Sequence, residues 1–248
     1  MNQSSNNLTQ VSDHYTSGAY WLEHQNSDST YKVRLLESLL EKSQLSLSST
    51  LKAAEIGCGQ GAFLFPFANY LENQKIQCKL LGYDISSQAI LLAKEKNKHS
   101  EDTLSFFIGS AENIPDGLDF IFCMDVLEHV ENPWELLRSL SSKSKYLILH
   151  LPIEQSIGHM LMQSPSHSYK TFRHIHFYSW ETAKILFQES PFKLLNYQFT
   201  AASNVSLKIA ASPMIRLLRL IRYFAYKFNP HLATMLGGGA VLLLLENK

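Results

Sequence analysis

Three glycines at alternate positions constrain this chain more than any other feature of its sequence. Gly57, Gly59 and Gly61 follow a short, mostly apolar run at 53–56 and precede a stretch with helical composition at 62–72. Glycine suits such a turn because the backbone must reach φ values closed to other residues, and because a Cβ would hold a ligand away from the main chain. The first N–H groups of the following helix have no partner within it. The pattern therefore predicts a turn that binds a nucleotide-like ligand.

Strand-like and helix-like segments alternate along the chain after this turn. Short apolar runs predict strands, and apolar residues at helical spacing predict helices. The predicted strands are 79–84, 104–108, 118–124, 146–151, 192–199 and 240–245, and the predicted helices are 29–42, 62–72, 86–96, 132 or 133 to 140, 180–190 and 213–228. Residues 155–171 show no strong period and are interpreted as an insertion or lid. This alternation predicts an α/β fold, a parallel sheet with helices on both faces.

Polar residues follow several of these predicted strands directly. Asp84 ends one strand, 110–112 follows another, and 124–129 follows a third. Ligands of such sheets bind beyond the carboxyl ends of the strands, near the point where the strand order reverses. We therefore expect these residues and the glycine turn to lie on one rim.

Composition narrows the range of partners and compartments. The 22 basic and 22 acidic residues give a net charge of zero, so nucleic acid is not an expected partner. The three cysteines lie in or beside apolar runs without metal-ligand spacing, which indicates buried thiols in a reducing compartment. No secretory signal and no membrane-spanning stretch is visible. We expect a cytoplasmic protein.

Taken in order, these motifs resemble those of class I S-adenosylmethionine-dependent methyltransferases. The resemblance is carried by Glu55-x-Gly57-x-Gly59-x-Gly61, by Asp84, by 110–115 and by 119–130, and it is strongest over 52–152. The segment 176–180 is similar to a late segment of the family. The resemblance implies a Rossmann-like, doubly wound sheet of seven mostly parallel strands with an antiparallel C-terminal hairpin. It also implies S-adenosylmethionine as the cofactor and a small-molecule acceptor.

The resemblance assigns cofactor contacts residue by residue. Glu55 would orient the ammonium group of the cofactor, Asp84 would pair with the two ribose hydroxyls, and Ser110 stands where the family commonly has Asp beside the adenine. The alternative for Asp84 is a helix cap. The full set of predicted cofactor-binding residues is Glu55, Gly57, Cys58, Gly59, Gly61, Asp84, Ile85, Ser110, Ala111, Glu112 and Met124.

Two other functions fit part of the pattern. Gly57, Gly59 and Ala62 also satisfy the dinucleotide pattern G-x-G-x-x-G/A, which favours an NAD-dependent oxidoreductase. The stretch 124–129 is explained by the methyltransferase family and not by a dehydrogenase. A subunit that binds the cofactor without catalysis is the remaining alternative.

Methyl transfer needs a base only where the acceptor must lose a proton, and histidine suits phenol or alcohol acceptors. His129 is the first candidate, and the further candidates are Asp125, Glu128, His150 and His176. In the alternative interpretation, Glu128 merely caps the helix that begins at Pro133.

A divalent metal is a second hypothesis for the same stretch. Asp125-x-x-Glu128-His129, with the later His174-x-His176, resembles the metal-binding arrangement of small-RNA 2′-O-methyltransferases and a related motif of ubiquinone-pathway O-methyltransferases. We assign no residue as a metal ligand from the sequence alone.

We divide the chain into an N-terminal tail with cap helices, 1–50, and a methyltransferase domain, 51–248. Insertions at 153–175 and 203–236 are expected to lie on the acceptor side. The helix 213–228 combines an apolar side with arginines, so peripheral contact with a membrane is a further possibility. The acceptor is expected to be methylated at oxygen, with lipid or quinone-like molecules among the candidates. The oligomeric state is not specified by the sequence.

Overall fold

The computed structural model describes residues 29–161, 164–200 and 213–248. Residues 1–28 and 201–212, which include parts of the predicted N-terminal region and acceptor-side insertion, lie outside the described residues.

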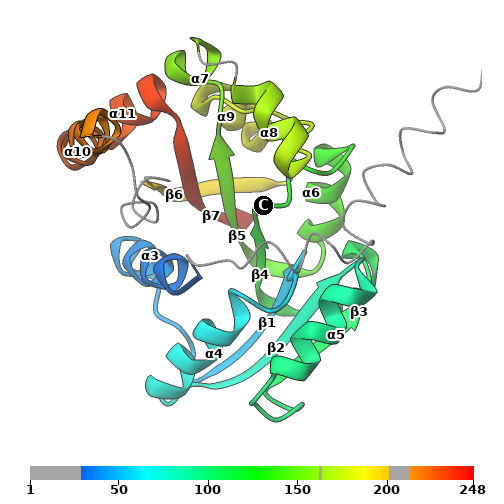
Figure 1. The fold of residues 1–248 in the computed structure, drawn as a ribbon. Helices are drawn as coiled ribbons and strands as arrows, with labels where there is room; N and C mark the ends of the chain where they lie inside the picture. Colours follow the sequence, from blue (N-terminus) through cyan, green and yellow to red (C-terminus); the bar gives the residue numbers. More distant parts are fainter. Residues whose placement is uncertain (1–28, 162–163, 201–212) are drawn as a thin grey trace, which may run out of the picture.

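A seven-stranded sheet organises the described chain, in the order β3-β2-β1-β4-β5-β7-β6 (Figure 1). The first five strands are parallel, whereas β7 is antiparallel to both β5 and β6. The predicted antiparallel C-terminal hairpin is therefore confirmed. The strands are β1 (Thr50–Ile56), β2 (Gln77–Asp84), β3 (Leu104–Ile108), β4 (Leu118–Met124), β5 (Ser144–Ile153), β6 (Phe192–Thr200) and β7 (Gly239–Asn247).

Helices cover both faces of this sheet, each with its own apolar core. Helices α3 (Ser29–Lys42), α4 (Leu64–Asn73) and α5 (Ser87–Lys96) bury Leu39, Phe67 and Ile90 on one face. Helices α6 (Pro133–Ser141) and α9 (Trp180–Gln188) bury Leu137 and Leu186 on the other. Alternate residues of a strand point to opposite faces, so the long apolar runs of β5 and β7 supply both cores. The predicted doubly wound α/β fold is confirmed.

The insertions contain more regular structure than their sequence indicates. Two short helices, α7 (Ile157–Leu161) and α8 (Ser164–Phe172), form in the stretch 155–171, and α8 extends one residue beyond it. Helix α10 (Pro213–Phe228) is followed at once by α11 (Pro230–Gly237), which the sequence analysis missed. Asn229 caps α11 by accepting a hydrogen bond from the Leu232 N–H, 3.0 Å. Figure 1 shows α10 and α11 lying together at one end of the sheet, with α7 and α8 beyond the carboxyl ends of the strands.

None of the described helices combines the length and the apolar character that crossing a bilayer requires.

Candidate active site

The glycine turn has the strained backbone that its sequence predicts. Gly57, Gly59 and Gly61 have φ values of 69°, 52° and 78°, in the left-handed region that residues with a Cβ rarely adopt. A Cβ on Gly57 would also collide with the side chain of Val126, from the loop after β4. The turn between β1 and α4 is therefore packed directly against the loop that carries the predicted catalytic residues.

Asp84 lies beside this turn, as the predicted ribose contact requires. Its Oδ2 accepts a hydrogen bond from the Gly59 N–H and its Oδ1 accepts one from the Ser86 N–H, both 2.8 Å. The side chain that caps α5 is that of Ser86, which accepts from the Ala89 N–H, 3.3 Å. Burial raises the pKa of Asp84, and the two backbone N–H groups oppose this rise. The carboxylate is thus fixed at the junction of β1 and β2.

Glu55 is a buried acid in β1 without a complete set of partners. Its side chain is 2% exposed, and Oε2 has no hydrogen-bond partner among the described residues. Burial raises the pKa of Glu55 well above its usual range, and nearby Lys32 lowers it in part. A buried carboxylate of this kind can accept from a ligand cation such as an ammonium group. The residue therefore fits its predicted role toward the methionine end of the cofactor.

The residues predicted to line the ribose and adenine differ in their exposure. Ile85 is 54% exposed, whereas Ala111 and Met124 are buried. Ser110 begins a short 3₁₀ turn, and its N–H donates to Asn113 Oδ1, 2.9 Å. Glu112, in the same turn, is exposed. The placement of these residues at the ends of β2, β3 and β4 agrees with the predicted rim, and their contacts with the cofactor stay a prediction.

Asp125 follows β4 and links three elements. Its carboxylate accepts from Lys32 Nζ of α3, 2.5 Å, and is hydrogen-bonded to His150 Nδ1, within β5. His150 Nε2 lies 3.3 Å from Thr200 Oγ1 of β6. Burial disfavours the charged form of Asp125, but His150 and Lys32 outweigh burial and hold its pKa well below the usual range. Asp125 therefore stays ionised and orients the His150 ring.

Glu128 and His129 belong to a second group, which includes His174. Glu128 is 1% exposed, and its Oε1 lies 3.8 Å from His129 Nε2. The rings of His129 and His174 meet edge to face, with centroids 4.8 Å apart. Burial and the neighbouring His174 lower the pKa of His129 to about 4. Burial, followed by Asp125, raises the pKa of Glu128 well above its usual range.

The residues that the sequence grouped as one catalytic or metal-binding set have different hydrogen-bond partners in the structure. Asp125 is held by Lys32 and His150, and His176 Nε2 lies 3.3 Å from the carbonyl oxygen of Glu131. The alternative that Glu128 caps α6 is wrong, because the cap is Asn132, whose Oδ1 accepts from the Glu135 N–H, 3.1 Å.

Two contributors to these groups were missed by the sequence analysis. Lys32 reaches Asp125 across 93 positions of the chain, and Glu154 reaches His174 across 20. No spacing pattern links either pair, so only the packing of α3 and of the α7–α8 insertion brings them together.

The comparisons with known proteins identify the family. Residues 23–197 match the family described as Methyltransferase domain, and the chain belongs to it.

Curated relatives match over a shorter stretch. The mitochondrial ubiquinone biosynthesis O-methyltransferase of Saccharomyces cerevisiae is 30% identical over 92 residues, which is 36% of this chain and 28% of the relative. The tRNA U34 carboxymethyltransferase of Campylobacter hominis is 31% identical over 94 residues, 37% of this chain and 31% of the relative. The matched stretch thus spans less than a third of either relative's length.

Solved structures share the fold over nearly the whole chain. The magnesium protoporphyrin IX methyltransferase of Synechocystis PCC 6803, with bound S-adenosylhomocysteine, has a TM-score of 0.63 at 14% identity, covering 98% of this chain and 100% of that one. A methyltransferase of Archaeoglobus fulgidus, described as dependent on S-adenosylmethionine, has a TM-score of 0.55 at 19% identity, covering 96% and 99%.

The protein is therefore a class I S-adenosylmethionine-dependent methyltransferase, with S-adenosylmethionine as its cofactor. The family match decides against the NAD-dependent oxidoreductase.

Proposed function

We propose that this enzyme transfers the methyl group to an oxygen atom of a small, partly apolar acceptor, such as a phenol that carries a hydrocarbon chain. The observation that carries the proposal is the hydrogen bond between Asp125, which follows β4, and His150, which pairs with the last residue of β4 from within β5. A hydroxyl acceptor must lose a proton during transfer, and an imidazole oriented by a carboxylate is suited to take it.

The Asp125–His150 pair has the arrangement of a base and the residue that positions it. With Nδ1 directed at the Asp125 carboxylate, the neutral ring of His150 carries its basic lone pair on Nε2, on the side of Thr200. Bound S-adenosylmethionine supplies a methyl group on a positively charged sulfur. The protein's contribution is to hold the acceptor oxygen in line with that methyl group and to receive the proton.

His129, the base predicted from the sequence, suits this task less well. Its pKa of about 4 makes it a weak proton acceptor at neutral pH. The ubiquinone biosynthesis O-methyltransferase relatives favour an oxygen acceptor, and the zero net charge of the chain disfavours a long nucleic-acid acceptor.

The proposal is tested by incubating the enzyme with isotopically labelled S-adenosylmethionine and, in separate reactions, an alkyl-substituted catechol, a primary amine and bulk tRNA. We expect label on a phenolic oxygen of the catechol, located by mass spectrometry. Label that enters only the amine or the tRNA would overturn the proposal.

His150→Gln tests the base. We expect kcat on the catechol to fall roughly 10²- to 10⁴-fold, with unchanged affinity for S-adenosylhomocysteine. The matched control is His167→Gln, on the exposed face of α8. Equal activity of the two variants would exclude His150 as the base.

A further inference from the structure

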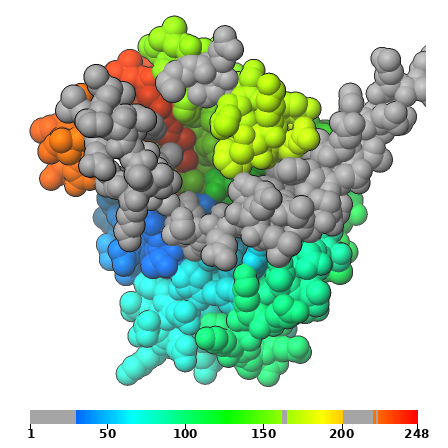
Figure 2. Space-filling view, in the orientation of Figure 1, coloured from blue at the N-terminus to red at the C-terminus, as the bar shows by residue number. Residues whose placement is uncertain are grey.

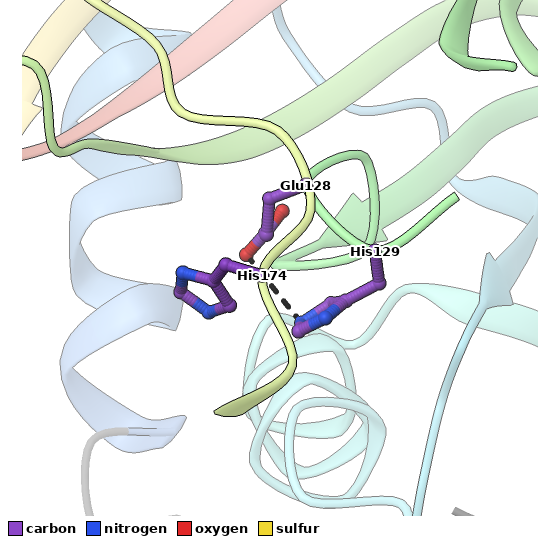
Figure 3. A group of neighbouring side chains, drawn as sticks. All are labelled: Glu128, His129 and His174. Carbon is purple, nitrogen blue, oxygen red and sulfur yellow. Dashed lines mark ion pairs between the residues drawn. The ribbon is translucent and has the colours of Figure 1, made fainter. Parts of the chain in front are cut away.

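A carboxylate and two imidazoles meet near the loop after β4, apart from the Asp125–His150 pair. Figure 3 shows Glu128 and His129 on one loop and His174 on a separate segment, with the three side chains gathered together. One ligand atom from each of the three residues lies within 4.8 Å of the others. The group therefore joins two parts of the chain that are distant in sequence.

Hydrogen bonds within the described part of the chain do not account for the burial of Glu128. It is 1% exposed, and neither carboxylate oxygen has a hydrogen-bond partner among the described residues. A buried carboxyl without partners is costly whether it is ionised or protonated, because the protonated form also lacks an acceptor for its O–H. A bound cation would satisfy both oxygens.

Each imidazole is oriented through Nδ1 by an oxygen outside the group. His174 Nδ1 lies 2.7 Å from Glu154 Oε2, and Glu154 Oε1 in turn accepts from Ser168 Oγ, 2.6 Å. His129 Nδ1 lies 3.3 Å from the carbonyl oxygen of Arg173. Histidine ligands of metals have this outer shell, in which one ring nitrogen donates to a carboxylate or carbonyl while the other binds the ion.

We propose that Glu128, His129 and His174 form a binding site for a divalent transition-metal ion. Two imidazoles and one carboxylate favour Zn²⁺ over Mg²⁺, which prefers an all-oxygen shell. Ligand atoms around Zn²⁺ lie about 2.1 Å from the ion and hence roughly 3.4 Å from one another. Side-chain rotations that move the ligand atoms by about 1 Å would therefore bring all three into contact with the metal. Three protein ligands leave a fourth position open.

The proposed set differs from the one suggested by sequence resemblance. Asp125 already binds Lys32 and His150, and His176 lies against the Glu131 carbonyl. Glu154, which no motif identifies, takes an outer-shell role instead. The site goes beyond the proposed O-methylation and stands whichever acceptor the enzyme uses.

The test is metal binding by the full chain, freed of metal by a chelator and then titrated calorimetrically with Zn²⁺ and spectroscopically with Co²⁺. We expect a single ion per chain and visible Co²⁺ absorption typical of a site with four or five ligands. His174→Ala should weaken Zn²⁺ binding more than about 100-fold, because a lost ligand costs more than a lost outer-shell partner. Glu154→Gln, which keeps all three ligands, should weaken it roughly 10- to 100-fold.

His176→Ala is the matched control, two positions from His174, and should bind Zn²⁺ as the wild type does. Absence of Zn²⁺ binding in the wild type, or equal affinity in His174→Ala and His176→Ala, would overturn the proposal. Circular dichroism checks that each variant is folded, and Glu128→Gln provides a second ligand variant of nearly the same shape. S-adenosylhomocysteine affinity, measured on the same samples, keeps this result separate from any failure of the proposed acceptor chemistry.

Discussion

At the scale of single residues, the site contains two acidic side chains that are buried before any ligand arrives. Within the part of the chain that the structure describes, Glu55 and Glu128 each have a carboxylate oxygen without a hydrogen-bond partner, and burial raises the pKa of both. Such groups cost stability in the free protein. They are explained most simply as groups kept for a charged ligand.

Glu55→Gln should stabilise the free enzyme while weakening cofactor binding. The folded pKa of Glu55 is raised, so its favourable contribution is complete below the unfolded pKa of about 4.3 and is lost as the pH rises through the folded value. Glutamine undergoes no such loss. The melting temperature of the variant relative to wild type should therefore increase as the pH rises above the unfolded pKa of Glu55, as measured by circular dichroism.

Affinity for S-adenosylmethionine should fall about 10- to 100-fold in the same variant, because an ammonium group loses its carboxylate partner. Glu101→Gln, at an exposed position, is the control and should change neither property. A variant that binds the cofactor normally would contradict the assigned role of Glu55.

The site residues whose position in the fold was predicted from the sequence are those next to the end of a strand. The sequence alone predicts that Gly59 and Asp84 lie close together, because the carboxyl ends of neighbouring parallel strands share one edge of a sheet. Lys32 and Glu154 could not be placed in this way, because their positions depend on how a helix or an insertion packs over the sheet. Local pattern contains no information on such contacts.

At the scale of elements, the turn between β1 and α4 offers a test that separates strain from packing. Gly57→Ala should destabilise the protein by the left-handed penalty of roughly 1–2 kcal/mol plus about 1–3 kcal/mol for the collision with Val126. Gly117→Ala should cost only the first amount, since Gly117 has a φ of 77° and none of the described residues lies within 4 Å of the added Cβ. Urea unfolding measures both.

Val126→Ala in the Gly57→Ala background should recover most of the packing cost. An equal decrease in the free energy of unfolding in Gly57→Ala and Gly117→Ala would show that the collision with Val126 does not contribute to the destabilisation.

Strongly patterned elements were predicted to within a few residues, and weakly patterned ones were missed. Helix α10 has the predicted limits of 213 and 228, and β3 and β4 also agree. Helix α11 escaped notice although Asn229 and Pro230 form a helix-start signal, because eight residues are too few to show a period. Helices α7 and α8 lack a clear apolar stripe, so contacts with neighbouring elements determine them.

At the scale of the whole molecule, the Lys32–Asp125 ion pair joins helix α3 to the edge of the sheet that the carboxyl ends of the parallel strands form. Lys32 is 6% exposed, and the Asp125 side chain is 33% exposed. Lys32→Met should destabilise the enzyme by about 1–2 kcal/mol, less than for a fully buried pair because water reaches Asp125. The kcat should also fall, because Asp125 loses one of the two groups that fix it.

The stability difference should have a defined pH dependence. The folded pKa of Asp125 is lowered, so its contribution is present above the unfolded value of about 3.9 and disappears as the pH falls through the folded value. The deficit of Lys32→Met should therefore shrink in acid, as urea unfolding at several pH values would show. Lys42→Met, an exposed position on the same helix, is the control; an equal deficit in both variants would contradict the role of Lys32.

The position of β7 between β5 and β6 has a consequence for synthesis on the ribosome. Strand β5 ends at Ile153, and the strand that covers its edge begins only at Gly239. A nascent chain must therefore carry a long, strongly apolar strand with an unpaired edge while the intervening helices are translated. Such an edge attracts other chains. Newly made copies should accordingly depend on chaperones until the ribosome has released β7.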